Sequence, residues 1–242
     1  MISLGAALSY GNTTDDASGV NQGNHSEIDS YQAMLYKAMN GQLANSTWYL
    51  NANVAIGQHQ VDTKRVINIS GLLDNPKGNF DAWQCSAKVE GGLPYIVSNI
   101  TTLIPIAPFS YSRLNQDGYE EHSNGGSALK ISNDNTDSVR NGLGDKALFN
   151  LGPSTFKTQL EGHAMWMYEL ADTRQDINAS FNSGGSAFNT KGMNVDRNAF
   201  NLGASLNLSN KAATQTFSVS YDAEIKDQYL SQSGRAQARF GF

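Results

Sequence analysis

The last ten residues of the chain, 233–242, restrict its fold more than any other segment. Every second position belongs to one apolar set, namely Gly234, Ala236, Ala238, Phe240 and Phe242. Arg235 and Arg239 stand in the alternate set, and because strand side chains point alternately to opposite faces, a strand here has one apolar and one charged face. A soluble strand rarely ends a chain on exposed aromatic residues. A strand that closes a barrel in lipid does so, with its arginines turned toward the lumen.

The same period of two recurs along the rest of the 242-residue chain. It predicts about twelve strands, at 2–11, 27–39, 48–62, 83–95, 101–114, 118–132, 137–150, 154–170, 173–181, 200–208, 217–224 and 233–242. Twelve is even, as single-chain bacterial barrels require, and the connections alternate roughly between tight and long. No repeat of about 20–50 residues and no linker divides the sequence. We therefore predict one all-β domain over residues 1–242, a transmembrane antiparallel β-barrel of about 12 strands.

Composition limits the other classes of protein. Net charge is −5, so the chain has no basic surface for nucleic acid and we expect no nucleic-acid partner. Cys85 is the single cysteine, which excludes an internal disulfide. The uncharged run 91–111 contains Pro94, Pro105 and Pro108, so it does not form a membrane-spanning helix. No basic segment followed by an apolar one begins the chain, so an export signal is expected upstream of it.

Six segments resemble, in their order and spacing, the C-terminal translocator domain of autotransporters, the type V secretion proteins. They read SLGAALSYG, SYQAMLYKAM, WYLNANVAIGQHQVDTKR, LIPIAPFSYSRLNQDGYEE, LEGHAMWMYEL and GRAQARFGF, and together they extend over nearly the whole chain. The resemblance implies a barrel in the outer membrane of a Gram-negative bacterium that anchors an N-terminal passenger and helps export it to the cell surface. It also implies that the passenger and a linker helix precede the domain, and it leaves open whether an initial strand does too.

The resemblance further implies an assembly signal and a set of partners. Phe240 and Phe242 would be the closing-strand residues that the barrel-assembly machinery recognises. The other expected partners are outer-membrane lipid and the chain's own N-terminal passenger. One position departs from the family pattern, because Gln237 stands five residues before the final Phe, where the family often has Gly.

Ten charged residues or histidines fall on the polar faces of the expected strands. They are Lys88, Glu90, Lys157, Glu161, His163, Glu169, Asp222, Glu224, Arg235 and Arg239. In a barrel they would line a hydrated lumen of mixed charge, suited to holding a polar helix or passing an unfolded segment. On a soluble sheet they would be ordinary surface charges. Aromatic residues gather toward the ends of the apolar faces, which favours the lumen.

The sequence lacks the spacing of a catalytic or metal site. The four histidines are widely spread, so zinc is not expected. Glu161 and Glu169 stand too far apart on one strand to act as a glycosidase pair. Ser127 lacks the strand and helix that flank a nucleophilic serine, and the run 134–137 predicts a turn and no calcium loop. We expect no enzyme activity, no catalytic residue, no cofactor and no metal.

Two other classes remain open at this point. One is a self-contained, porin-like outer-membrane barrel, which a long constricting loop with clustered charges would favour. The other is a soluble β-sandwich that binds carbohydrate through its outward aromatic residues. A requirement for detergent during extraction separates the sandwich from the two barrels.

Overall fold

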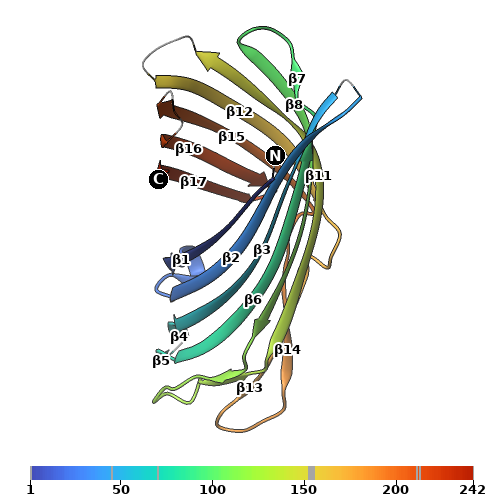
Figure 1. The fold of residues 1–242 in the computed structure, drawn as a ribbon. Helices are drawn as coiled ribbons and strands as arrows, with labels where there is room; N and C mark the ends of the chain where they lie inside the picture. The colour runs from blue at the N-terminus through green and yellow to red at the C-terminus, as the bar shows by residue number, and fades with distance from the viewer. Residues whose placement is uncertain are drawn as a thin grey trace.

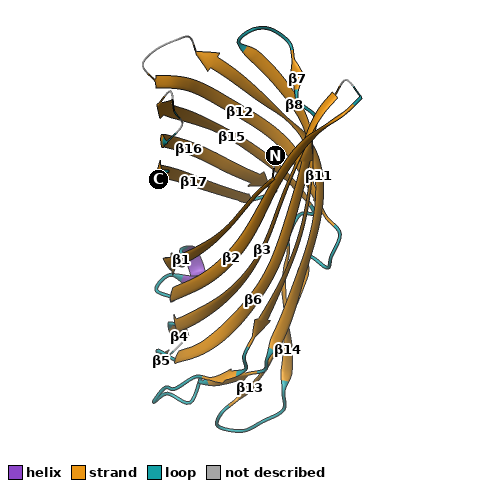
Figure 2. Ribbon diagram, in the orientation of Figure 1, coloured by secondary structure: helices purple, strands orange, loops and turns teal. Residues whose placement is uncertain are grey.

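The chain is almost entirely β in a computed structural model, which describes residues 2–44, 46–69, 71–151, 156–210, 212 and 214–241 (Figures 1 and 2). A 3-10 turn, η1 (Gly19–Asn21), interrupts the first connection. In this part of the chain no helix is long and apolar enough to cross a membrane. Phe242, one of the two expected assembly-signal residues, lies outside the described residues.

Ten long strands form one curled antiparallel sheet in chain order (Figure 1). They are β1 (Ile2–Asp16), β2 (His25–Leu43), β3 (Ser46–Lys64), β6 (Lys77–Gly92), β8 (Thr101–Gln116), β11 (Asp134–Leu151), β12 (Phe156–Glu169), β15 (Asn198–Asn210), β16 (Gln215–Lys226) and β17 (Tyr229–Phe240). The two-residue strand β7 (Tyr95–Ile96) pairs with β8. Within the described residues β1 and β17 are the sheet edges, each paired on one side.

The register of the strands separates the side chains into two faces. Leu8 pairs with Ala33, Ala33 with Ile56, and Ile56 with Cys85, so an apolar row crosses four strands on the convex face. Leu8 on this face is 87% exposed, whereas Ile106 on the concave face is 3% exposed. The large apolar side chains of this protein therefore lie mostly on the outside of the sheet, which is the reverse of a soluble domain.

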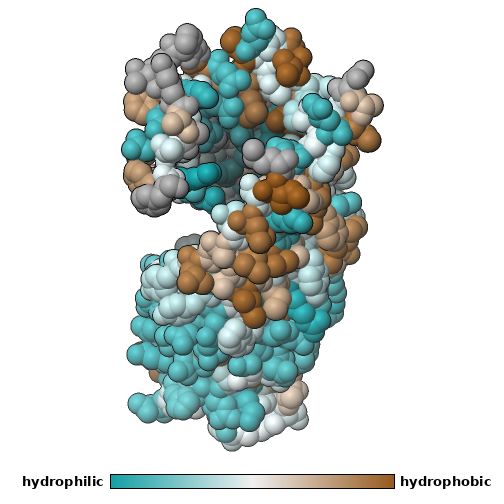
Figure 3. Space-filling view, viewed as in Figure 1, coloured by the Kyte–Doolittle hydropathy of each residue, from teal (hydrophilic) through white to brown (hydrophobic). Residues whose placement is uncertain are grey.

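The apolar part of the convex face has the height of a bilayer. It runs from Trp83 on β6 to Leu93 just after this strand, about 33 Å along the chain and about 25 Å along the membrane normal at a tilt of about 40°. Tyr10, Tyr31 and Trp83 lie in one cross-strand row at its border, with the two tyrosine rings 5.3 Å apart. The apolar surface ends there, and a hydrophilic surface continues beyond it (Figure 3).

The two ends of the sheet differ in their connections. The long ones contain a hairpin, β4 (Ile67–Ile69) and β5 (Leu72–Asp74), and a second sheet in the order β14-β13-β10-β9. The strands of that sheet are β9 (Tyr119–Glu120), β10 (Leu129–Ile131), β13 (Arg174–Phe181) and β14 (Phe188–Asn194). Two of the twelve expected strands fall in this second sheet: 173–181 contains β13, whereas 118–132 is not one strand but contains β9 and β10 with a loop between them. The turn expected at 134–137 is also wrong, because β11 begins at Asp134 and pairs with β8 from there. Alternation alone does not reveal which sheet a strand joins, because the period is the same in both.

The curled sheet does not have the architecture of a β-sandwich. A sandwich packs two sheets face to face about 10 Å apart, with its apolar residues between them. In the described part of the chain all ten long strands belong to one sheet, and its apolar face is exposed. The soluble sandwich alternative is therefore wrong.

Glycines on the concave face leave room for rings on the neighbouring strands. A Cβ atom on Gly203 would lie 2.3 Å from the ring of His163, and one on Gly92 would lie 2.4 Å from the ring of Tyr49. In both places the ring covers the glycine backbone of the adjacent strand, a pairing that stabilises sheets where glycine removes side-chain contacts. These rings fix the register of β12 against β15 and of β3 against β6.

Gly203→Val is expected to destabilise the folded barrel by about 1–3 kcal/mol, because the added side chain displaces the ring of His163. The matched variant is Gly162→Val, since the atom nearest to a Cβ there is 4.0 Å away. The effect is measured by heating samples to a series of temperatures and finding the midpoint at which the gel mobility of the protein changes. Equal midpoints for the two variants would contradict the packing role of Gly203.

Candidate functional site: the concave face

All ten charged or histidine residues expected in the lumen lie on the concave face. The cross-strand register shows this. The partners of Lys88 and Glu90, followed across β8 and β11, belong to the same face as His163 of β12 and Asp222 of β16. Lys157, Glu161 and Glu169 come from β12, and Arg235 and Arg239 from β17.

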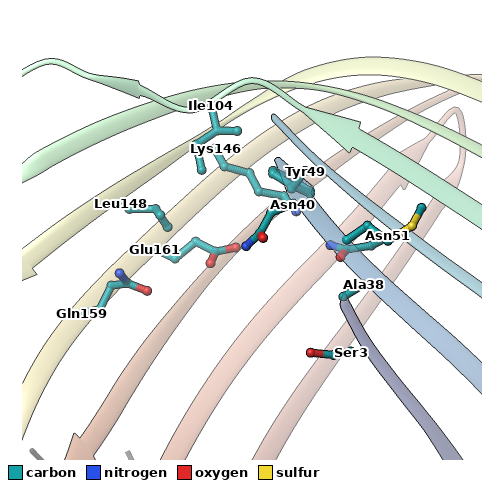
Figure 4. A pocket seen from close by; sticks show the side chains of 11 residues that line it. Ser3, Ala38, Asn40, Tyr49, Asn51, Ile104, Lys146, Leu148, Gln159 and Glu161 are labelled. Carbon is teal, nitrogen blue, oxygen red and sulfur yellow. The ribbon is translucent and has the colours of Figure 1, made fainter. Parts of the chain in front are cut away.

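The first cluster on this face joins three strands around Glu90, which is 8% exposed. Lys146 Nζ of β11 lies 2.5 Å from Glu90 Oε1 of β6, and the hydroxyl of Tyr49 on β3 donates to the same oxygen at 3.0 Å. Lys146 Nζ also lies 5.9 Å from the centroid of the Tyr49 ring. The carboxylate of Glu90 thus accepts two hydrogen bonds and neutralises the charge of Lys146. Lys146 and Tyr49 line a cavity of about 280 Å³ (Figure 4).

A second cluster occupies the same face nearer the long connections. Arg140 binds two carboxylates, with Nε 3.2 Å from Glu169 Oε2 and Nη1 3.3 Å from Glu224 Oε2. Lys226 Nζ lies 3.1 Å from the other oxygen of Glu224. His163 Nε2 lies 3.2 Å from Asp222 Oδ1. Four of the five acidic residues expected on this face therefore have a basic partner, and Glu161 is the exception among them.

Part of the charge expected on the concave face is left unpaired. Among the described residues, five of the ten expected side chains form no ion pair within 4.0 Å: Lys88, Lys157, Glu161, Arg235 and Arg239. Four of these five are basic. The same face also carries the buried apolar side chains of Ile104, Ile106 and Met167, so it is neither uniformly polar nor uniformly charged.

Sequence reasoning missed the cations that pair with these acids. Lys146 and Arg140 come from β11, where Gly142, Gly144 and Leu148 occupy the concave set and weaken the polar alternation. The alternation of side chains places Tyr49 on the polar face of its strand. Its hydrogen bond to Glu90, however, joins residues 41 positions apart and depends on the pairing of β3 with β6. Only the register brings these groups together.

The described residues do not assemble a recognisable metal or nucleophile site. No three His, Cys, Asp or Glu side chains among them are placed to hold one metal ion. His59 lies between Ser30 Oγ at 2.9 Å and Gln84 Oε1 at 3.1 Å, contacts that hold neighbouring strands together.

The convex face carries the other expected site residue that the structure describes. Phe240 is 55% exposed on that face, and its ring meets Phe217 at 6.1 Å in an edge-on arrangement. This aromatic pair lies near the short-turn end of the sheet, opposite the border formed by Tyr10, Tyr31 and Trp83. Aromatic residues at both borders of an apolar band are typical of a surface that crosses a lipid bilayer.

A buried carboxylate in the long connections also escaped sequence reasoning. Asp74 is 6% exposed and accepts hydrogen bonds from Ser127 Oγ, from Ser123 Oγ at 2.8 Å, and from the backbone N–H groups of Asn75 and Ser127 at 2.9 and 3.2 Å. These donors, the Ser127 hydroxyl first, lower the pKa of Asp74 to about 2. Ser127 is a partner of this carboxylate and has no nucleophilic arrangement.

An antiparallel sheet that curls in chain order, apolar outside and charged inside, defines the wall of an outer-membrane β-barrel. The profile of the "Autotransporter beta-domain" family matches residues 1–222, and the chain belongs to that family. Its location is accordingly the outer membrane of a Gram-negative bacterium.

Comparison with individual proteins agrees with this assignment. The translocator domain of the autotransporter NalP from Neisseria meningitidis superposes with a TM-score of 0.75 at 16% identity, covering 100% of this chain and 76% of that one. "Outer membrane protein A" of Rickettsia rickettsii is 20% identical over 246 residues, and that of Rickettsia conorii is 20% identical over 244. These matches cover 100% and 99% of this chain but only 11% and 12% of the relatives' own lengths.

Lys146→Met is expected to lower the free energy of unfolding by about 3 kcal/mol, because it leaves the buried Glu90 carboxylate without its cation. The double variant Glu90→Gln with Lys146→Met is expected to recover part of this loss. Urea unfolding in detergent measures both variants. As a control, Asp137→Asn removes the exposed Arg113–Asp137 pair, whose atoms are 3.7 Å apart, and is expected to cost less than about 1 kcal/mol.

The long connections are expected to loosen below about pH 4 through Asp74. Because folding lowers the pKa of this carboxyl to about 2, its contribution is complete above the unfolded value of about 3.9 and is lost as pH falls through about 2. Pepsin cleavage within residues 117–133 is the measurement. Asp74→Asn is expected to be cleaved faster than wild type at pH 4 and equally fast near pH 2, and a constant difference would contradict the assignment.

Proposed function

We propose that this chain is the outer-membrane translocator of a longer protein, which it anchors and whose N-terminal passenger it helps export to the cell surface. The observation that carries the proposal is the concave face, where paired acids and free bases line the inside of a family-typical barrel wall. A surface of this kind offers hydrogen bonds and charges to a polar chain without holding any single sequence tightly.

The ten residues predicted from the sequence act in this proposal as lumen residues. The neutralised clusters around Glu90 and Arg140 keep the wall rigid, because each buried charge has its partner. The unpaired cations Lys157, Arg235 and Arg239 give a positive potential to the half of the concave face that lies toward the short turns. Export then depends on conformation and electrostatics, and the domain acts without a catalytic residue.

Residues 1–242 form one translocator domain in this proposal, with a passenger and a linker helix on the N-terminal side. The unpaired edges of β1 and β17 support a closed wall in which each finds a partner, since lipid tolerates no open sheet edge. Two further antiparallel strands beside the ten long ones would complete a barrel of about 12 strands.

Outer-membrane lipid and the barrel-assembly machinery are the proposed partners besides the passenger. The exposed apolar band on the convex face supports contact with lipid acyl chains. Phe240, exposed on that face at the end of the last strand, supports recognition of the closing strand, and Phe242 is proposed to act with it.

Phe240→Ser and Phe242→Ser are each expected to remove most of the heat-modifiable, membrane-assembled protein, because the closing strand loses an aromatic residue at the interface. Phe181→Ser is the matched control, since this ring lies in the second sheet and contacts Phe188 at 5.6 Å. Gel mobility with and without boiling, after detergent extraction, checks the outcome. Normal assembly of both closing-strand variants would count against the signal.

Surface display tests export itself. An epitope reporter placed between an export signal and residue 1 is expected to become accessible to protease on intact cells, and to lose that accessibility with Phe242→Ser. An assembled, heat-modifiable barrel whose reporter stays inside the cell envelope would support the porin-like alternative.

A further inference from the structure

Three long connections leave the same end of the curled sheet. They are residues 65–76 between β3 and β6, 117–133 between β8 and β11, and 170–197 between β12 and β15. We call the described parts of these three connections the collar. In the fold the collar contains the β4–β5 hairpin and the whole second sheet (Figure 1).

One buried residue, Glu121 in the second connection, ties the collar together through its carboxylate and its backbone oxygen. Glu121 is 2% exposed. Arg65 of the first connection donates to both of its carboxylate oxygens, from Nε at 2.6 Å and from Nη2 at 2.5 Å. Asn182 of the third connection donates from Nδ2 to the backbone oxygen of Glu121 at 2.8 Å. A single residue thus contacts all three connections.

Neighbouring contacts follow the same pattern. Arg65 Nη2 also donates to the carbonyl of Ser127 at 3.2 Å, and Asn182 N donates to the carbonyl of Ala128 at 3.0 Å. Asp74 of the first connection holds the side chain of Ser127. A bidentate pair of this type is strong, and without Arg65 the buried charge of Glu121 would be uncompensated. This pair holds the first two connections together, and the bond from Asn182 and the pairing of β10 with β13 couple the third connection to them.

The third connection also overhangs the concave face. A cavity of about 870 Å³ lies between Arg140 and Lys226 of that face and Arg174 and Val195 of the β13–β14 segment. Arg197 fixes the base of the overhang, because its Nη1 donates to the carbonyl oxygens of Glu169 at 3.0 Å and Ala171 at 2.8 Å.

We propose that the collar is a single gate over the outer mouth of the concave face, and that the Glu121–Arg65 pair is its latch. With the latch made, the β13–β14 segment stays over the mouth. When it is released, the three connections loosen together and the mouth opens. The gate requires the barrel but not the passenger, so it stands or fails separately from export.

Thiol labelling in proteoliposomes tests the gate. Thr136 lines the cavity beneath the overhang, so Thr136→Cys in a Cys85→Ser background reports access to it. Glu121→Gln is expected to speed labelling by a maleimide on a large polyethylene glycol chain by about tenfold or more. Glu120→Gln is the matched control, because the side chain of this adjacent residue forms an exposed pair with Lys130 at 2.7 Å, and it is expected to change the rate less than about twofold.

Hydrogen exchange on the same variants tests whether the collar moves as one unit. Glu121→Gln is expected to raise exchange in all three connections while β12 and β15 stay protected. Unchanged labelling, or faster exchange in residues 117–133 alone, would overturn the gate.

Asn182→Ala keeps the latch and the backbone pairing of β10 with β13 but removes the side-chain hydrogen bond from the third connection to Glu121, and it provides a second test if Glu121→Gln fails to assemble. It is expected to raise exchange in residues 170–197 and to speed labelling of Thr136→Cys. Wild-type values for both measurements in this variant would equally overturn the proposal.

Discussion

Backbone hydrogen bonding in lipid is the constraint on which the rest of this structure depends. A bilayer offers no water to an unpaired N–H or C=O group, so a spanning chain of strands has to satisfy each one within a sheet. The ladder from β1 to β17 does this in chain order everywhere except at its two outer edges, with each long strand antiparallel to the next. Once this ladder exists, the two faces follow from the alternation of side chains, and every polar group is directed either to the concave face or to the membrane border.

The two faces then solve different problems. The convex face is exposed and apolar over a bilayer's height and needs no specific contacts. The concave face cannot be apolar throughout if a polar chain is to pass, so it carries charges, and the buried ones are held by Arg140, Lys146 and Lys226. Glycines such as Gly203 and Gly92 leave room for bulky rings against the concave face.

Much of this arrangement follows from local sequence, and the remainder depends on contacts between distant residues. The faces of Glu90, Glu169, Asp222 and Glu224 follow from period-two alternation, which needs no knowledge of pairing. Their partners do not, because Arg140 and Glu224 are 84 residues apart. The collar was the least predictable part, since the Arg65–Glu121 pair spans 56 residues and lies in polar connections where alternation has no meaning.

The unequal lengths of the strands have an evolutionary consequence. β2 and β3, with 19 residues each, continue well beyond the apolar band, whereas β16 and β17 have 12. β3 carries the first connection of the collar clear of the lipid, so substitutions on the outer surface of that connection are free of the hydrophobic requirement that governs the band. Divergence between relatives, and recognition by antibodies, are therefore expected to concentrate there, while the spanning strands retain their alternation of side chains.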